Sequence, residues 1–134
     1  MAAIRNETRR VGSDEDVVRV RHLVREWAVG AGFSLVDQTK LVTAASELAR
    51  NLVQHAGGGE MHIETLNSGP KVGLRLTFAD RGPGIRDIEQ AMRDGFTTGN
   101  GLGLGLGGSK RLVNDFEIQS RPGEGTTVKI TRWK

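Results

Sequence analysis

Residues 72–85 read VGLRLTFADRGPGI and place a strand directly before a tight glycine-rich turn. Leu74, Leu76 and Phe78 alternate with polar residues, which predicts a strand with one buried face. Asp80 follows at the strand end, and the pattern Asp-x-Gly-x-Gly lets the backbone turn sharply and approach a ligand closely. Taken alone, the stretch is equally compatible with an ordinary Pro-Gly turn.

The rest of the chain also divides into expected strands and helices. Grouped strands predict a mixed or antiparallel β-sheet covered on one face by helices, an α+β two-layer sandwich. A length of 134 residues fits one domain, residues 1–134. Strands are expected at residues 3–11, 60–67, 72–79, 116–120 and 126–133, and helices at residues 13–30, 34–55, 87–94 and, after a glycine-rich segment, as far as 114.

Composition narrows the classes of function. The chain has no cysteine and three scattered histidines, which argues against disulfides and a zinc site. Its net charge of +3 is spread along the chain and only 4% of residues are aromatic, so no nucleic acid partner is expected. Neither a secretory signal nor a run of eighteen apolar residues is found. A cytoplasmic protein with no membrane contact is therefore the expectation.

A polar pair lies off the apolar stripe of the helix expected at residues 34–55, near its C-terminal end. Glu47 and Asn51 are four residues apart and project from one face of the helix. A carboxylate can accept a proton, and an amide oxygen is a hard neutral ligand that suits Mg²⁺. The ordinary alternative is a pair of polar side chains facing solvent.

Glycine makes up seven of the fourteen residues from 95 to 108, which predicts a functional loop inside the domain. Its second half reads GLGLGLGG at residues 101–108 and leads into Ser109 and Lys110. Such a backbone entering a helix presents free N–H groups to phosphate. Gly103, Gly105 and Gly108 formally match the dinucleotide pattern G-x-G-x-x-G, but no strand precedes them and too little chain follows. The Gly-Lys-Ser/Thr of a P-loop is also missing.

Together and in this order, the three motifs resemble the N, G1 and G2 boxes of the GHKL (Bergerat) ATP-binding superfamily. The resemblance spans about residues 43–130, including the closing Gly125-Thr126-Thr127-Val128. With ELARN at 47–51, DRGPGI at 80–85 and DGFTT at 94–98, the chain is most similar to the RsbT-type switch-protein serine/threonine kinases. The resemblance implies the Bergerat ATP-binding fold and a kinase that uses ATP and Mg²⁺.

The family resemblance also implies partners. A kinase of this type phosphorylates a serine on a STAS-domain antagonist protein, in stressosome assemblies that contain a possible STAS scaffold. Phosphorylation then frees the kinase to activate a downstream PP2C-type phosphatase or another output protein.

Roles for individual residues follow by position from the resemblance. Asn51 would coordinate the Mg²⁺ that bridges the ATP phosphates, and Glu47 would take the proton from the attacking serine. Asp80 would bind the adenine amino group, assisted by Thr126 through a water. Lys110 would either add charge near the phosphates or lie in solvent. The implied nucleotide-binding set is Asn51, Asp80, Gly82, Gly84, Ile85, Gly101, Leu102, Gly103, Leu104, Gly105, Leu106 and Thr126.

Three rival functions share the same motifs. An anti-sigma factor kinase would bind a sigma factor directly, although the GLGL-rich loop favours the switch-protein type. A non-catalytic ATP-dependent partner-switching module would not need Glu47 and Asn51, which are both present. The third rival is a detached histidine-kinase catalytic domain. Against it, the sequence shows no helical segment that is expected to carry a phosphoacceptor histidine.

Overall fold

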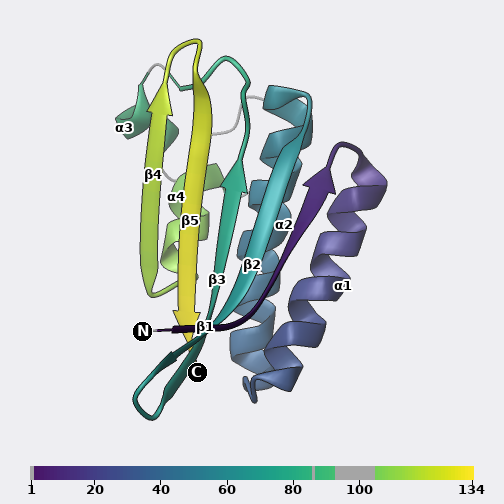
Figure 1. The fold of residues 1–134 in the computed structure, drawn as a ribbon. Helices are drawn as coiled ribbons and strands as arrows, with labels where there is room; N and C mark the ends of the chain where they lie inside the picture. Colours follow the sequence, from purple (N-terminus) through teal and green to yellow (C-terminus); the bar gives the residue numbers. More distant parts are fainter. Residues whose placement is uncertain (1, 86, 93–104) are drawn as a thin grey trace.

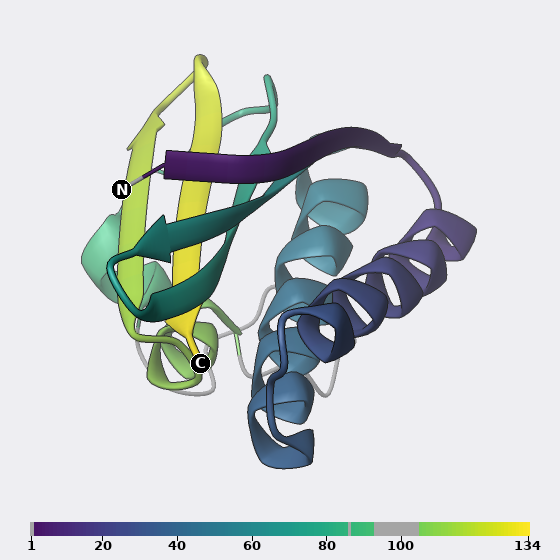
Figure 2. The ribbon, with the colours of Figure 1, turned by 60° about the horizontal axis from the view of Figure 1, so that its bottom comes forward.

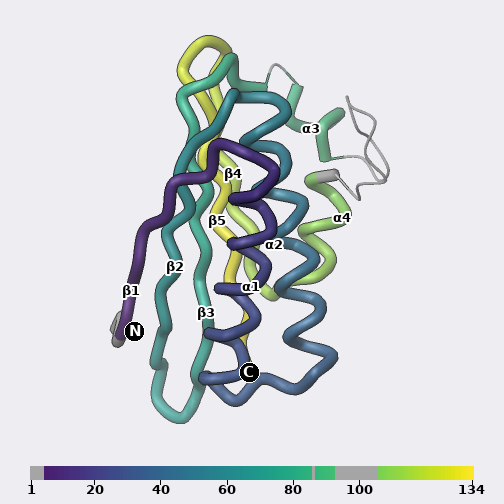
Figure 3. The backbone as a smooth tube through the Cα atoms, turned by 90° about the vertical axis from the view of Figure 1, so that its right-hand side faces the viewer, coloured from purple at the N-terminus to yellow at the C-terminus, as the bar shows by residue number. Residues whose placement is uncertain are grey.

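A computed structural model describes residues 2–85, 87–92 and 105–134, and it has two layers (Figure 1). A five-stranded sheet forms one layer, and all the helices lie on one of its faces, as the edge-on view shows (Figure 3). None of the described helices is long and apolar enough to cross a membrane. The elements are β1 (Ala2–Val11), α1 (Asp14–Gly30), α2 (Leu35–Ala56), β2 (Gly59–Ser68), β3 (Lys71–Ala79), α3 (Ile88–Ala91), α4 (Gly105–Arg111), β4 (Asp115–Arg121) and β5 (Gly125–Trp133).

Every strand pair in the sheet is antiparallel, and the strand order is β1-β2-β3-β5-β4. The predicted α+β two-layer sandwich is therefore confirmed. The prediction allowed a mixed or an antiparallel sheet, and the sheet is antiparallel. The last strand, β5, lies between β3 and β4. As a result, the end of β3 and the start of β5 lie side by side, with Ala79 opposite Thr127.

Caps fix the two long helices where the sequence predicts them. The Ser13 and Ser34 side chains accept hydrogen bonds from the backbone N–H groups three residues later, at the starts of α1 and α2. Gly57 ends α2 in the left-handed conformation, with φ of 72°. Both helices contact each other and cover β1, β2 and β3 (Figure 2).

The core lies between the long helices and the sheet. Leu74, Leu76 and Phe78 of β3 are at most 2% exposed, which confirms the buried face that their alternation predicts. They pack in one cluster with the apolar stripe of α2, including Leu41 and Leu48. Burial of this kind is the main term that stabilises a fold. It also holds α2 rigidly over the middle of the sheet.

Two predicted helices are shorter than the sequence suggested. The structure ends α4 at Arg111, whereas the prediction extended the helix to 114. Beyond Arg111 the chain turns tightly, and the Asn114 N–H donates to the carbonyl of Thr131 in β5 at 2.9 Å. This bond commits Asn114 to the sheet. The helix predicted at residues 87–94 is described only as the single turn α3, capped by Asp87.

A salt bridge ties the start of α2 to the last strand. The Arg132 guanidinium donates to the Asp37 carboxylate at 2.7 Å, across 95 residues of sequence. It also donates to the carbonyl of Leu112, just after α4, at 3.2 Å. The hydrogen bond from Arg132 is the main cause that holds the pKa of Asp37 below its ordinary value of 3.8. Arg132 therefore joins α2, β5 and the end of α4.

This pair makes a prediction about stability in acid. Because the folded pKa of Asp37 is below the unfolded one, the pair contributes stability above the unfolded value of about 3.9, and this is lost as the pH falls through the folded pKa. Asp37→Asn should lower the free energy of unfolding at neutral pH and flatten its decline in acid. Urea unfolding followed from pH 7 to pH 2 measures both effects. Asp115→Asn, which removes an exposed carboxylate of β4, is the control, and equal slopes for both variants would contradict the prediction.

Candidate functional site

Asp80 lies at the end of β3, where its carboxylate is held by two backbone N–H groups. Its Oδ1 atom accepts hydrogen bonds from Gly82 N at 2.9 Å and from Thr126 N at 3.2 Å. The Asp80 N–H donates in turn to the Thr126 carbonyl at 2.9 Å. The side chain is half-buried, and no hydrogen bond to its Oδ2 atom is found among the described residues. One carboxylate oxygen is therefore fixed by the protein, and the other is available to a ligand.

Glycines allow the Asp80 loop to fit between α2 and the β4–β5 hairpin. A Cβ at Gly82 would lie 2.8 Å from the Ala56 Cβ at the end of α2. Gly84 has φ of +76°, and a Cβ there would overlap the Arg121 carbonyl oxygen. The sequence prediction gave Gly82 and Gly84 the role of making room for a ligand. The structure adds that both glycines let the loop pack closely against the rest of the protein, and the ligand role stays a prediction.

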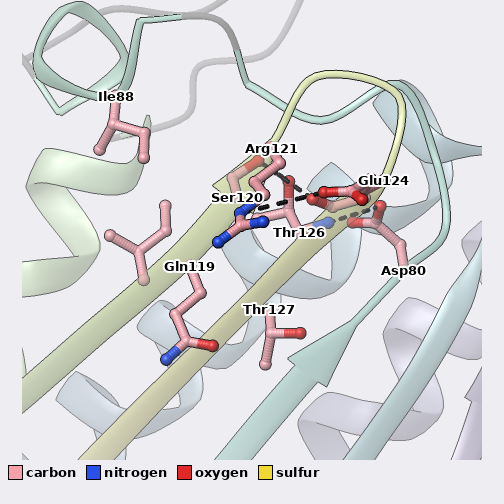
Figure 4. Close-up of a pocket in the computed structure, with 10 residues that line it drawn as sticks. Asp80, Ile88, Gln119, Ser120, Arg121, Glu124, Thr126 and Thr127 are labelled. Carbon is pink, nitrogen blue, oxygen red and sulfur yellow. Dashed lines mark hydrogen bonds and ion pairs between the residues drawn. The ribbon is translucent and has the colours of Figure 1, made fainter.

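A cavity of about 610 Å³ opens beside this loop (Figure 4). Asp80 and Thr126 both line it, so the structure brings these two predicted residues together. Ile88 of α3 lies across from them, over the sheet (Figure 4). The remaining lining residues were not predicted from the sequence: Ile118, Gln119, Ser120, Arg121, Glu124, Gly125 and Thr127.

Ser120, which was not predicted from the sequence, connects the loop to the cavity wall. The Ile85 N–H donates to Ser120 Oγ at 2.8 Å, which places Ile85 beside the cavity wall. Ser120 Oγ also lies 2.7 Å from Thr126 Oγ1 and 3.2 Å from the Gly125 carbonyl oxygen. A serine within a strand carries no pattern of its own. Only the hairpin motif Gly-Thr-Thr that follows could have drawn attention to it.

Glu47 and Asn51 lie on α2, outside the set of residues that line the cavity. Both are half-buried. The Glu47 carboxylate forms an ion pair with Arg50 at 3.2 Å, and the Glu47 side chain is 13% exposed, against 32% for Arg50. The helix therefore presents a carboxylate and an amide one turn apart on a partly open face. Farther along the same helix, Ala56 at its end packs closely against Gly82 of the Asp80 loop.

The glycine-rich segment is described only from its end. Gly101, Leu102, Gly103 and Leu104 lie outside the described residues. Gly105 starts α4, and Leu106 is buried against the core at 8% exposure. The next two polar residues of this helix differ in exposure: Ser109 is fully buried and Lys110 is exposed. Helix α4 packs against α2.

No group of three or more His, Cys, Asp or Glu side chains that could hold a metal ion is found among residues 2–85, 87–92 and 105–134. Mg²⁺ in nucleotide sites is commonly held by one or two protein oxygens together with phosphate oxygens. The half-buried amide of Asn51, one turn from the Glu47 carboxylate, is a donor of the type that such a site requires.

The chain is similar to proteins of known families. The family model described as histidine kinase-, DNA gyrase B-, and HSP90-like ATPase matches residues 36–134. Serine/threonine-protein kinase RsbT of Bacillus subtilis (strain 168) is 45% identical over 124 residues, which cover 92% of this chain and 93% of that protein. An anti-sigma F factor of Thermoanaerobacter sp. (strain X514) is 30% identical over 119 residues, 84% of this chain and 82% of that protein.

Two solved structures share the fold. The crystal structure of the RsbU and RsbW domains of a Mycobacterium tuberculosis protein superposes with a TM-score of 0.62 at 23% identity, covering 96% of this chain and 31% of that chain. The mycobacterial sensor histidine kinase MprB gives a TM-score of 0.55 at 19% identity, covering 96% of this chain and 97% of that one.

The docking of the Asp80 loop can be tested through its glycines. Gly84→Ala should destabilise the protein by about 2–4 kcal/mol, because the new methyl group meets the Arg121 carbonyl and the backbone is left-handed. Gly123 is the matched control. It has φ of +79° and open space around it, so Gly123→Ala should cost only about 1 kcal/mol. Urea unfolding measures both variants, and equal losses would show that the loop does not pack as described.

Proposed function

This chain belongs to the histidine kinase-, DNA gyrase B- and HSP90-like ATPase family and is a serine/threonine-protein kinase of partner switching, and we propose that it phosphorylates a serine on a STAS-domain antagonist protein. The observation that supports ATP as the phosphate donor is the Asp80 carboxylate at the edge of a cavity, where Oδ1 is held by two backbone N–H groups and Oδ2 has no hydrogen bond among the described residues. A carboxylate oxygen there accepts a hydrogen bond from the exocyclic amine of adenine. Thr126 assists through a water.

The catalytic step takes place along α2. Glu47 accepts the proton of the serine hydroxyl as the serine oxygen bonds to the γ-phosphorus of ATP. The bond between that phosphorus and the β,γ-bridging oxygen breaks, which gives ADP and phosphoserine. Asn51 would hold Mg²⁺, which would neutralise phosphate charge when bound. Phosphoryl transfer depends mainly on positioning and charge stabilisation, so these few groups suffice.

Partner switching follows from the same chemistry. The unphosphorylated antagonist, held on a STAS scaffold of a stressosome in the cytoplasm, retains the kinase. Once its serine carries a phosphate, the antagonist releases the kinase, which then activates a PP2C-type phosphatase or another output protein. The relative that is 45% identical and is named a serine/threonine-protein kinase supports the phosphorylation step.

A second candidate, an anti-sigma factor kinase, is favoured by the relatives named anti-sigma F factor, at 30% identity over 84% of this chain. The two proposals differ in the protein that the nucleotide-loaded kinase retains. Pull-down of purified STAS-domain and sigma-factor candidates with ATP present separates them. Retention of a sigma factor alone would favour the second candidate.

The kinase proposal is tested through Glu47. Glu47→Gln keeps the shape and the hydrogen-bonding groups but removes the base, so transfer of labelled phosphate from ATP to the STAS protein should fall about 10²-fold or more. Affinity for Mg·ATP, measured by calorimetry, should stay unchanged. Gln54→Glu, an exposed change on the same helix, is the control. Native-rate transfer by the Gln variant would exclude Glu47 as the base, and no transfer by the native protein would leave a non-catalytic switching module.

The role of Asp80 is tested through the purine. Asp80→Asn keeps an oxygen for the two backbone N–H groups and turns an amide donor toward the cavity. ATP should then bind more weakly by roughly 1–3 kcal/mol, because its 6-amino group meets another donor. Inosine triphosphate, with a carbonyl at that position, should bind better than it does to the native protein. Equal loss for both nucleotides would show that Asp80 does not contact the 6-position of the base.

A further inference from the structure

The Ser120 hydroxyl makes three contacts at the cavity wall. It accepts from the Ile85 N–H at 2.8 Å, and it lies 3.2 Å from the Gly125 carbonyl oxygen and 2.7 Å from Thr126 Oγ1. These contacts join the Asp80 loop, β4 and β5 at one atom. The labelled side chains of Ser120, Thr126 and Asp80 come together beside the cavity (Figure 4).

The hydrogen-bonding capacity of a hydroxyl decides how these contacts are arranged. A serine hydroxyl donates one hydrogen bond and accepts two. The Ile85 N–H occupies one acceptor position, and the Gly125 carbonyl can only accept, so it takes the single hydrogen of Ser120. All three contacts are hydrogen bonds at once only if Thr126 donates its own hydrogen to Ser120. This arrangement uses the full capacity of Ser120.

This arrangement decides which groups the Thr126 hydroxyl can bind in the cavity. With its hydrogen committed to Ser120, the Thr126 hydroxyl offers only lone pairs to the cavity. The free Oδ2 of Asp80 is also an acceptor. Two acceptors side by side suit a group rich in donors, such as an amine together with a water that bridges to a ring nitrogen. A carbonyl at the same place would face two acceptors and no donor.

We propose that Ser120 is a positioning residue that sets the polarity of the Thr126 hydroxyl and thereby selects 6-amino purine nucleotides over 6-oxo ones. The inference rests on the proposed function, because it places the purine against Asp80 and Thr126. It adds a residue that does not contact the base. Ser120 acts through the hydrogen of Thr126.

A merely structural role predicts a different result. If Ser120 only anchors the loop through Ile85, its removal loosens the site for every nucleotide by the same factor. The ratio of affinities for ATP and inosine triphosphate then stays constant. If Ser120 sets the polarity of Thr126, its removal lets that hydroxyl rotate and donate into the cavity. The ratio then falls.

The experiment measures the dissociation constants of ATP and inosine triphosphate by calorimetry on the full chain. Ser120→Ala should reduce the preference for ATP about 10-fold, the value of one hydrogen bond. With ATP, KM should rise while kcat at saturation stays unchanged, because Ser120 belongs to the wall proposed to bind the base and not to α2, where the transfer is proposed. Ser120→Thr keeps the hydroxyl and should restore the preference. Thermal unfolding without nucleotide shows whether each variant is folded, and Ser120→Cys, a poor hydrogen-bonding group of similar size, replaces the Ala variant if that one is not.

Thr126→Val completes the test. This change removes the hydroxyl through which Ser120 acts, so it should lower the preference by itself, and Ser120→Ala should add nothing in its presence. A constant ratio in Ser120→Ala, or the same fall with and without Thr126, would overturn the inference. Native protein that binds ATP and inosine triphosphate equally would instead overturn the proposed adenine contact of Asp80, and the inference with it.

Discussion

The site depends on one pair of hydrogen bonds, those that Asp80 Oδ1 accepts from the backbone of Gly82 and of Thr126. The second of these joins residues 46 positions apart in the sequence. It is possible because β5 inserts beside β3 and brings its first residues to the end of that strand. With Asp80 fixed at this junction, the loop after it is pressed between α2 and the hairpin, and only glycine fits at the closest points. The strand order, the conformation of the loop and the direction of the Asp80 carboxylate therefore depend on one another.

The same constraint separates recognition from chemistry. In the proposed mechanism, the base is recognised by atoms whose positions the sheet dictates, at the end of β3 and the start of β5. The proposed chemistry takes place at Glu47 and Asn51 on α2, which the buried face of the sheet holds in place. A partly exposed ion pair such as that between Glu47 and Arg50 contributes little to stability, about 1 kcal/mol at most, so in the proposed mechanism an arriving hydroxyl displaces the guanidinium. The ion pair with Arg50 orients the Glu47 carboxylate.

Much of this architecture could be predicted from the sequence, for reasons that are local. Ser13 and Ser34 begin helices because a serine oxygen satisfies an exposed N–H group, and β3 alternates because one of its faces is buried. The strand order could not be predicted, since alternation tells which face is buried and not which strand is the neighbour. The end of α4 was missed for a related reason. The bond from Asn114 to Thr131 belongs to the sheet and leaves no trace in the helical pattern.

For the site, the sequence predicted residues whose spacing is distinctive and gave no sign of those defined by tertiary contact. Glu47, Asn51 and Asp80 stand in recognisable motifs, and the structure adds that Asp80 and Thr126 share a cavity. Ser120 and Arg132 are ordinary residues of strands, and their partners lie 35 and 95 positions away. A hydroxyl or a guanidinium gains its role from the number of acceptors and donors that the fold places around it. Where Ser120 has three partners and one hydrogen, counting those partners determines the direction of every bond, and with it the polarity of the wall that the ligand meets.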